Sequence, residues 1–138
     1  MQSKHVLVVD DFKYSRDLYE LCLSQQGFRV TLASDGQEAL DKAFQLRPDV
    51  VIMDLSLPVL SGAEATRRLK ADERTRHIPV LILSAYDSFG LPADVKCDGF
   101  LVKPCLPDKV VSEILRVLDK TSMESPSSAT AAGAGEAS

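Results

Sequence analysis

The sequence predicts an α/β fold in which helices cover both faces of a five-stranded, doubly wound parallel sheet. Two observations carry this prediction. Short runs rich in Val, Ile and Leu alternate along the chain with stretches whose apolar residues recur every three or four positions. Most residues of the short runs are apolar, which is typical of parallel strands that are buried on both faces. Alternating strands and helices on one chain favour right-handed crossovers between neighbouring parallel strands.

Five apolar runs are expected to form the strands. Each is short, rich in branched side chains and bounded by polar or turn-forming residues. The runs are HVLVV (5–9), FRVTL (28–32), DVVIM (49–53), IPVLIL (78–83) and GFLV (99–102).

The first three helices have sequence signals at one end. Gly27 follows the first helical stretch, and glycine favours the left-handed conformation that ends many helices. Ser34 with Gln37, and Ser61 with Glu64, have the spacing of a capping box. These pairs predict the starts of the second and third helices.

The last helix is expected from Pro107 to about Lys120, because its apolar residues form one stripe and proline suits a first helical turn. Residues 121–138, TSMESPSSATAAGAGEAS, are almost all small or polar and have no stripe to bury. We therefore expect one folded domain over residues 1–120 and a disordered, low-complexity tail over 121–138.

The overall composition excludes several classes of function. The formal net charge is −4 and the basic residues are scattered, which argues against nucleic acid or an anionic membrane as a partner. No apolar run approaches the ~20 residues that span a bilayer, and the N-terminal MQSKH is unlike a secretion signal. A cytoplasmic location is expected.

Cysteine and histidine give no sign of a disulfide framework or a zinc site. Cys22, Cys97 and Cys105 form no C-x-x-C pair and are expected to be reduced packing residues. His5 and His77 stand far apart and are expected to flank strands.

Several polar groups stand where the predicted strands end. They are Asp10 and Asp11 after the first strand, Asp54 after the third, Ser84 after the fourth and Lys103 after the fifth. In an open parallel sheet, ligands bind at the carboxyl ends of the strands, so these groups are expected to converge. Any one acid could simply cap a loop or helix. Three carboxylates in one crevice would repel one another, and such oxygen ligands suit Mg²⁺.

The motifs VLVVDDF, VVIMDLSLPVLSG, LILSA and GFLVKP, in this order, resemble the receiver domain of bacterial response regulators of the chemotaxis CheY type. The resemblance covers residues 4 to about 120. It implies a flavodoxin-like sheet with strand order 2-1-3-4-5. It also implies a stand-alone response regulator in a two-component phosphorelay, because no output domain is recognised.

The resemblance assigns a phosphorylation site. Asp54 is similar to the phosphoryl acceptor, a carboxylate nucleophile that forms an aspartyl phosphate. Asp11 and Asp54 would bind Mg²⁺ directly, Asp10 through water, and the backbone carbonyl of Ser56 would complete the metal ligands of the protein. No other cofactor is implied.

Four further positions have roles implied by the resemblance. Lys103 would bind a phosphoryl oxygen, and Ser84 would move to bind another once Asp54 is modified. Phe100 stands where an aromatic residue turns inward behind that serine, although a buried aromatic residue can equally be plain core. Ser56 and Tyr86 stand where the access of water to the phosphoryl group is set.

The segment between the fourth and fifth strands departs from the family pattern. Only nineteen positions separate Ser84 from Lys103, about one helical turn fewer than is usual in the family, and Gly90 and Pro92 lie between them. We expect residues 86–98 to form a short helix or an irregular loop, so that the usual helix 4 is short, displaced or missing.

Two hypotheses of function follow. In the first, a histidine kinase or phosphotransfer protein phosphorylates Asp54, and the changed surface binds an unknown downstream protein. The protein would then promote its own modification without being a turnover enzyme. In the second, the fold is an interaction module that works without phosphorylation and uses the altered helix 4 region.

Two enzyme-like alternatives are disfavoured. A phosphatase with an Asp nucleophile, of the haloacid-dehalogenase type, needs a second Asp where Ser56 stands. A dinucleotide-binding domain needs glycines after the first strand, where the sequence is DDFKYS.

Overall fold

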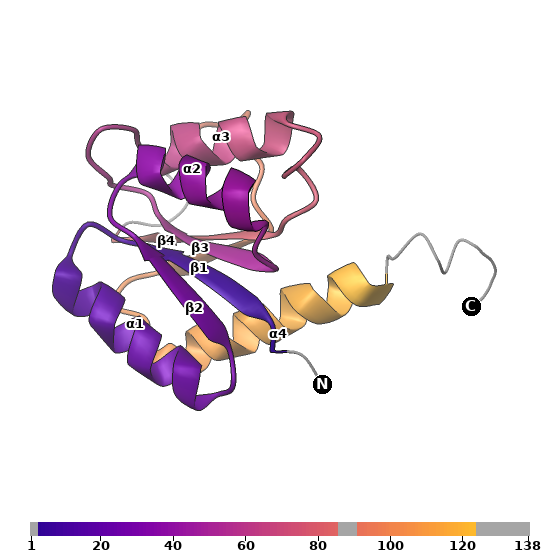
Figure 1. The fold of residues 1–138 in the computed structure, drawn as a ribbon. Coiled ribbons are helices and arrows are strands. Elements are labelled where there is room, and N and C mark those ends of the chain that lie inside the picture. Colours follow the sequence, from indigo (N-terminus) through magenta and orange to yellow (C-terminus); the bar gives the residue numbers. More distant parts are fainter. Residues whose placement is uncertain (1–2, 86–90, 124–138) are drawn as a thin grey trace.

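The computed structural model describes residues 3–85 and 91–123, which form a sheet between two layers of helices (Figure 1). No helix within these ranges is long and apolar enough to cross a membrane.

Five parallel strands form the sheet in the order β2-β1-β3-β4-β5, which confirms the predicted fold and strand order. The strands are β1 (His5–Val9), β2 (Arg29–Ala33), β3 (Val50–Asp54), β4 (Val80–Ser84) and β5 (Gly99–Val102). Every residue of β1, β3 and β4 is buried, whereas the two edge strands are partly exposed. The three fully buried strands therefore occupy the centre of the sheet.

The strand bounds lie within two residues of the predicted ones. The largest shift is at the start of β4, where the apolar run begins at Ile78 but the strand begins at Val80. The Ile78 N–H donates to the Thr75 carbonyl oxygen instead of joining the sheet. Pro79 has no N–H to donate, so regular pairing begins after it.

Within the described residues, four helices cover the sheet. They are α1 (Lys13–Gln25), α2 (Gly36–Leu46), α3 (Gly62–Ala71) and α4 (Pro107–Met123). Figure 1 shows α2 and α3 on one face and α1 and α4 on the other. Each face has its own core: Leu40 and Leu69 belong to the cluster with α2 and α3, and Leu23 and Ile114 to the cluster with α1 and α4.

The predicted start of α2 is wrong by one residue. Asp35, not Ser34, is the N-cap, and its Oδ1 accepts a hydrogen bond from the Glu38 N–H at 2.7 Å. Glu38, not Gln37, completes the box, because its Oε1 accepts from the Ser34 N–H at 2.7 Å. Serine and aspartate are both good caps, so the local sequence allowed two registers. The observed one places the Glu38 carboxylate in the first turn, where the helix dipole favours negative charge.

The other predicted helix ends are confirmed at α1 and α3. Ser61 is the N-cap of α3, and its Oγ accepts from the Glu64 N–H at 3.1 Å. Gly27 has a φ of 95° just after the C-cap of α1, a conformation that glycine adopts without a Cβ clash.

The last helix is longer than predicted. It begins at Pro107 as expected but ends at Met123 rather than near Lys120. Its predicted stripe is confirmed by the full burial of Val110 and Ile114. The predicted tail from residue 124 onward lies outside the described residues.

For the connection between β4 and β5, the sequence predicts a short helix or an irregular loop over residues 86–98; within its described part, residues 91–98 contain no helix. Residues 86–90 lie outside the described residues. The described part is nevertheless held to the domain, because Val95 is buried and both carboxylate oxygens of Asp94 accept hydrogen bonds from Arg67 at 3.0 Å.

The cysteines and histidines build no common site among the described residues. Cys22, Cys97 and Cys105 are free and half-buried, which agrees with packing roles. His5 is buried within β1, and His77 is exposed before β4.

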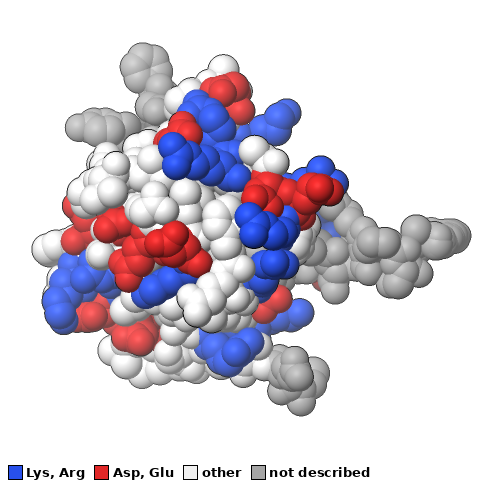
Figure 2. Space-filling model, turned by 45° about the horizontal axis from the view of Figure 1, so that its top comes forward, with Lys and Arg blue, Asp and Glu red and all other residues white. Residues whose placement is uncertain are grey.

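Charged side chains of both signs are interspersed over the face that Figure 2 presents. This face therefore has no broad field of a single sign, in line with the scattered charges of the sequence.

Candidate functional site

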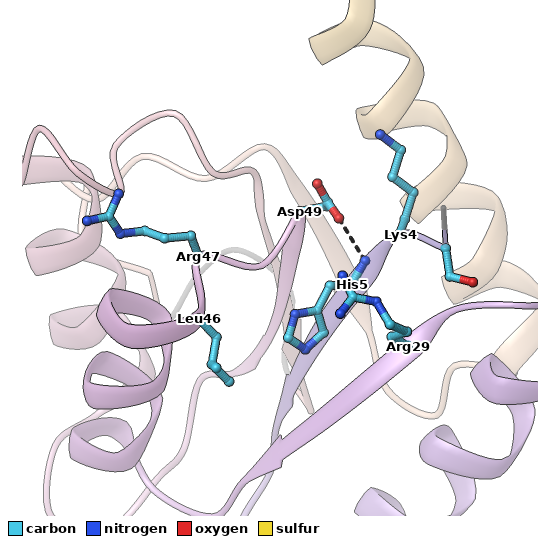
Figure 3. Close-up of a pocket in the computed structure, with 7 residues that line it drawn as sticks. Lys4, His5, Arg29, Leu46, Arg47 and Asp49 are labelled. Atoms are coloured by element: carbon cyan, nitrogen blue, oxygen red, sulfur yellow. Dashed lines mark hydrogen bonds between the residues drawn. The ribbon is translucent and has the colours of Figure 1, made fainter. Parts of the chain in front are cut away.

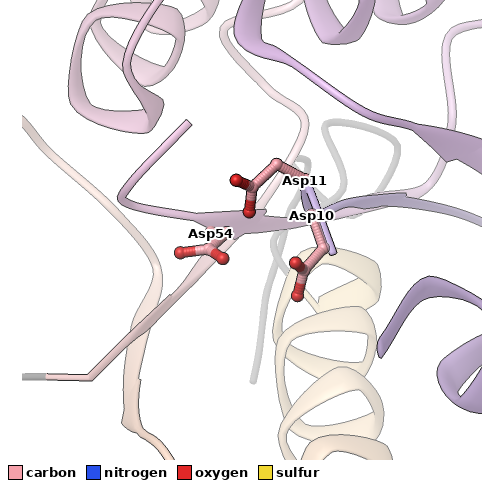
Figure 4. A group of neighbouring side chains, drawn as sticks. All are labelled: Asp10, Asp11 and Asp54. Atoms are coloured by element: carbon pink, nitrogen blue, oxygen red, sulfur yellow. The ribbon is translucent and has the colours of Figure 1, made fainter. Parts of the chain in front are cut away.

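Three carboxylates meet at the carboxyl ends of β1 and β3, as the sequence predicted. One oxygen from each of Asp10, Asp11 and Asp54 lies within 4.8 Å of the other two, and Figure 4 shows the group. Asp10 is 2% exposed and Asp54 6%, whereas Asp11 is exposed. The group therefore has two buried members and one at the mouth of the crevice.

Lys103 brings a positive charge to the two buried carboxylates. Its Nζ lies 2.9 Å from Asp54 Oδ2 and 3.4 Å from Asp10 Oδ2. The Lys103 N–H donates to the Ser84 carbonyl oxygen at 2.7 Å, which fixes the start of the side chain beside the end of β4. Since β4 separates β5 from β3, a long side chain is needed to cross it.

The pKa directions of the pair follow from burial and charge. Burial raises the pKa of Asp54 above its usual value; Lys103 opposes this change, and the charge of Asp10 adds to it. Burial alone would lower the pKa of Lys103, but the two carboxylates outweigh burial and raise it. The lysine is therefore held in its charged form.

Backbone and side-chain donors orient the two buried acids. The Phe12 N–H donates to Asp10 Oδ1 at 2.9 Å, and Arg16 Nη1 donates to the Asp10 carbonyl oxygen at 2.7 Å. The Ser56 N–H donates to Asp54 Oδ1 at 3.1 Å. The sequence argument missed Arg16. Its place one turn into the helix after the acid pair is the only local signal for it.

Close approach of backbones sets the position of Asp54. A Cβ on Gly62 would lie 2.0 Å from the Asp54 carbonyl oxygen and 2.9 Å from Leu55 Cα. The Gly62 N–H also donates to the Leu55 carbonyl oxygen at 3.0 Å. The first turn of α3 therefore packs directly on the backbone that carries the acceptor candidate, and only glycine fits there.

The residues present fit a magnesium ion. Three carboxylates face a single lysine, which leaves an excess of negative charge, and hard oxygen donors are the ligands that Mg²⁺ prefers. Asp11 at the mouth offers an oxygen beside water. The Ser56 carbonyl, implied as a further ligand, stays a prediction.

The remaining predicted residues lie as follows. Ser84 is 4% exposed at the end of β4, between β3 and β5. Phe100 is half-buried and packs against the core on the α2 and α3 side. Ser56 is exposed beside Asp54, and Tyr86 lies outside the described residues.

Comparison with known proteins supports the resemblance to receiver domains that the sequence motifs indicated. Residues 6–115 match the family model of the response regulator receiver domain. The chain is 32% identical over 114 residues to the polar-differentiation response regulator DivK of Brucella anthropi, covering 80% of this chain and 93% of the relative.

Solved structures agree as well. The receiver domain of the sensor histidine kinase PA1611 of Pseudomonas aeruginosa, which has a magnesium ion in its active site cleft, is similar with a TM-score of 0.79 and 30% identity. That match covers 85% of this chain and 98% of the other. Chemotaxis protein CheY4 of Vibrio cholerae has a TM-score of 0.74 at 31% identity, with 83% and 98% covered.

The sheet order, the carboxylate cluster with its lysine, and the match over most of the chain lead to one conclusion. This chain belongs to the response regulator receiver domain family.

Proposed function

We propose that this chain is the receiver of a two-component phosphorelay, in which Asp54 accepts a phosphoryl group from a phosphohistidine. The donor would be a histidine kinase or a phosphotransfer protein. The observation that carries the proposal is the contact of Lys103 Nζ with both Asp54 and Asp10, at 2.9 and 3.4 Å, inside a crevice with a third carboxylate.

The chemistry follows from the groups in the crevice. A carboxylate oxygen of Asp54 attacks the phosphorus atom, and a new P–O bond forms as the P–N bond to the imidazole breaks. The electron pair of that bond stays on the imidazole nitrogen. Because phosphoryl transfer depends mainly on positioning and charge stabilisation, the chain needs no general base at this step.

Lys103 stabilises the negative charge of the transferred group. Its ammonium already lies within hydrogen-bond distance of the acceptor carboxylate, so it can follow a phosphoryl oxygen without leaving the crevice. Asp10, Asp11 and Asp54, with the Ser56 carbonyl, would hold Mg²⁺. When bound, this ion offsets the charge on the phosphoryl oxygens.

Phosphorylation would then change the protein surface. The phosphoryl group on Asp54 carries up to about two negative charges, about one more than the free carboxylate, and its oxygens give the Ser84 hydroxyl a new acceptor. Phe100, on the neighbouring strand and only half-buried, is the residue proposed to move behind Ser84. A downstream protein would bind the changed surface. No nucleic acid or membrane is proposed as a partner, and the chain is not proposed to turn over an external substrate.

A second candidate rests on the connection between β4 and β5. Its described part has no helix but is held by the ion pair between Arg67 and Asp94. Such a surface could bind a partner without any phosphorylation. In that case Asp54 would be dispensable for partner binding.

The deciding experiment is intact mass measurement after incubation with phosphoramidate. The proposal expects one added phosphoryl group with Mg²⁺ and none in EDTA. Asp54→Asn should abolish the addition. Asp11→Ala should weaken Mg²⁺ binding, so that more Mg²⁺ is needed for the same rate of addition. Asp17→Asn, an exposed acid on α1, is the matched control and should be modified like the wild type.

Two outcomes would overturn the proposal. The first is addition at a residue other than Asp54. The second is a lack of addition to a folded protein with both acetyl phosphate and phosphoramidate. The second outcome would favour the interaction module.

A further inference from the structure

A second hollow lies at the opposite edge of the sheet from the acidic crevice. It has a volume of about 300 Å³ and is lined by Ser3, Lys4, His5, Arg29, Leu46, Arg47 and Asp49. These residues come from the starts of β1, β2 and β3 and from the end of α2 (Figure 3). Since β1 has five residues, the hollow is roughly 17 Å from Asp10, at about 3.3 Å per residue. The two sites therefore share no side chain.

The lining of this hollow is strongly basic in a chain of net charge −4. Its lining includes three cationic side chains, Lys4, Arg29 and Arg47, and a single carboxylate. That carboxylate, Asp49, is already occupied on one side, because its Oδ2 accepts from the His5 N–H at 2.7 Å. The local charge is therefore opposite in sign to that of the whole chain.

The cations of the hollow have spare donors. Within residues 3–85 and 91–123, the side chains of Lys4 and Arg29 make no hydrogen bond or ion pair. Arg47 uses its Nε for the Phe44 carbonyl oxygen at 3.1 Å, which leaves both Nη groups for another acceptor. Figure 3 shows the Arg29 side chain reaching toward His5 and Asp49 at the middle of the group. A planar guanidinium with free N–H groups matches the oxygens of a phosphate.

The backbone of Arg47 is an independent sign. Arg47 has φ 49° and ψ 61°, the left-handed conformation, at the C-cap of α2. Glycine or asparagine is the usual residue there, and a residue with a larger side chain adopts this conformation at a cost of about 1 kcal/mol. This conformation ends α2 beside the hollow, and the residue that adopts it adds a positive charge to the lining.

From this geometry we propose that the hollow binds a small phosphorylated molecule through its phosphate group. Arg29 is the central contact and Lys4 is a contact at the rim. The Arg47 side chain points away from His5 and Asp49 in Figure 3 and would turn toward the phosphate on binding. A phosphate monoester carries close to two negative charges at neutral pH, which matches three cations and one carboxylate better than a single carboxylate ligand would. The volume is at the lower end of the range for small-molecule sites, so a compact ligand is expected.

The test is a titration of the protein with inorganic phosphate at constant ionic strength, in buffer that contains EDTA. Binding is monitored through the amide chemical shifts of the protein. Saturable shifts are expected at His5, Arg29 and Arg47. Acetate at the same concentration should give less than a fifth of these shifts. EDTA keeps metal out of the acidic crevice, so binding there is tested apart from this site.

Matched variants decide whether the hollow is the site. Arg29→Gln should raise the Kd for phosphate at least fivefold. Arg76→Gln removes an exposed arginine before β4, at the same edge of the sheet, and should change the Kd less than twofold. If Arg29→Gln does not fold, as judged by circular dichroism, Arg47→Gln takes its place with the same expectation.

Three results would overturn the proposal. They are shifts that grow without saturation, equal effects of the Arg29 and Arg76 variants, and shifts centred on Lys103 instead of His5. None of them bears on phosphorylation of Asp54, because the two sites are separate.

Discussion

The Nζ of Lys103 lies 2.9 Å from Oδ2 of Asp54, although 49 positions of sequence separate the two residues. The contact crosses β4, because Lys103 follows β5 and Asp54 ends β3. The Asp54 side chain is only 8% exposed, so its carboxylate is largely shielded from water in this ion pair. The fold therefore places a positive charge where three carboxylates would otherwise repel one another.

Lys103→Met is expected to destabilise the metal-free protein. The change leaves Asp10 and Asp54 buried without a counter-charge. Breaking such a pair costs about 3–5 kcal/mol when it is fully buried, and about 1–3 kcal/mol is expected for a lysine that keeps some contact with water. Urea unfolding in EDTA at pH 7 measures this loss of unfolding free energy. Mg²⁺ should stabilise the variant more than the wild type.

The control for this prediction is Lys109→Met, at an exposed position on α4. It should lower the unfolding free energy by less than about 0.5 kcal/mol, as is usual at exposed sites. Equal stability of the Lys103 variant and the wild type in EDTA would show that the ion pair does not neutralise the crevice.

Gly62→Ala should impair both stability and phosphorylation. The new Cβ would meet the Asp54 carbonyl oxygen at 2.0 Å, so α3 or the end of β3 must move. Overpacking of this kind costs about 1–3 kcal/mol, and the displaced Asp54 should be phosphorylated at least tenfold more slowly. Unfolding and the rate of mass increase with phosphoramidate measure the two effects.

Gly27→Ala is the informative comparison. No atom lies within 4 Å of its new Cβ, but the φ of 95° is unfavourable for alanine. It should lower stability, by about 1–2 kcal/mol, and leave the phosphorylation rate unchanged. Similar phosphorylation rates for the two variants would mean that Gly62 does not position Asp54.

The convergence of the site could be predicted because it depends on chain direction and strand order. In a parallel sheet every strand ends at the same edge, and the strand order implied by the family resemblance makes the strands of Asp54 and Ser84 neighbours. The buried central strands could also be predicted, since a continuous apolar run is the pattern of a strand covered on both faces.

Other features depend on side-chain choices that the residue pattern does not fix. Asp35 and Ser34 are both good caps, and the structure uses Asp35, with the Glu38 carboxylate bonded to the Ser34 N–H. The bond from Arg16 to the Asp10 carbonyl could not be predicted, because an arginine on a helix usually has no fixed partner. The length of α4 was underestimated because small polar residues can continue an existing helix.

Glu38→Gln is expected to lower stability at neutral pH but not in acid. Hydrogen bonds from the Ser34 backbone and from Lys42 lower the pKa of Glu38 from 4.5 to about 2. A lowered pKa in the folded state stabilises the protein above pH 4.5, and this contribution is lost as pH falls toward 2. The carboxylate is more than a third exposed, so about 1 kcal/mol is expected after solvent screening.

Urea unfolding at pH 7, 4 and 3 measures this effect as the difference between wild type and variant. The difference should shrink as the pH falls. Glu20→Gln, at an exposed position on α1, should show little difference at any of these pH values. A constant difference for Glu38→Gln would mean that the carboxylate charge does not stabilise the start of α2.

The segment at residues 91–98 is expected to depend on one ion pair for its order. Arg67 donates from Nε and Nη2 to the two carboxylate oxygens of Asp94, each at 3.0 Å, and so joins the segment to α3. Within the segment, the Val95 N–H donates to the Pro92 carbonyl oxygen at 3.0 Å. Asp94→Asn should therefore speed amide exchange of Val95 severalfold while leaving β4 unchanged, because β4 is held by its own strand pairing.

Asp119→Asn, an exposed acid on α4, is the matched control and should leave exchange of Val95 unchanged. Exchange is the right measurement because an ion pair at the surface changes global stability little, whereas opening of one segment is read directly at its own amides. If Asp94→Asn leaves the exchange of Val95 as slow as in the wild type, burial of the Val95 side chain is sufficient to hold the segment. In that case packing of Val95 in the core would hold the surface between α3 and β5. A partner could then bind this surface whether or not the ion pair is formed.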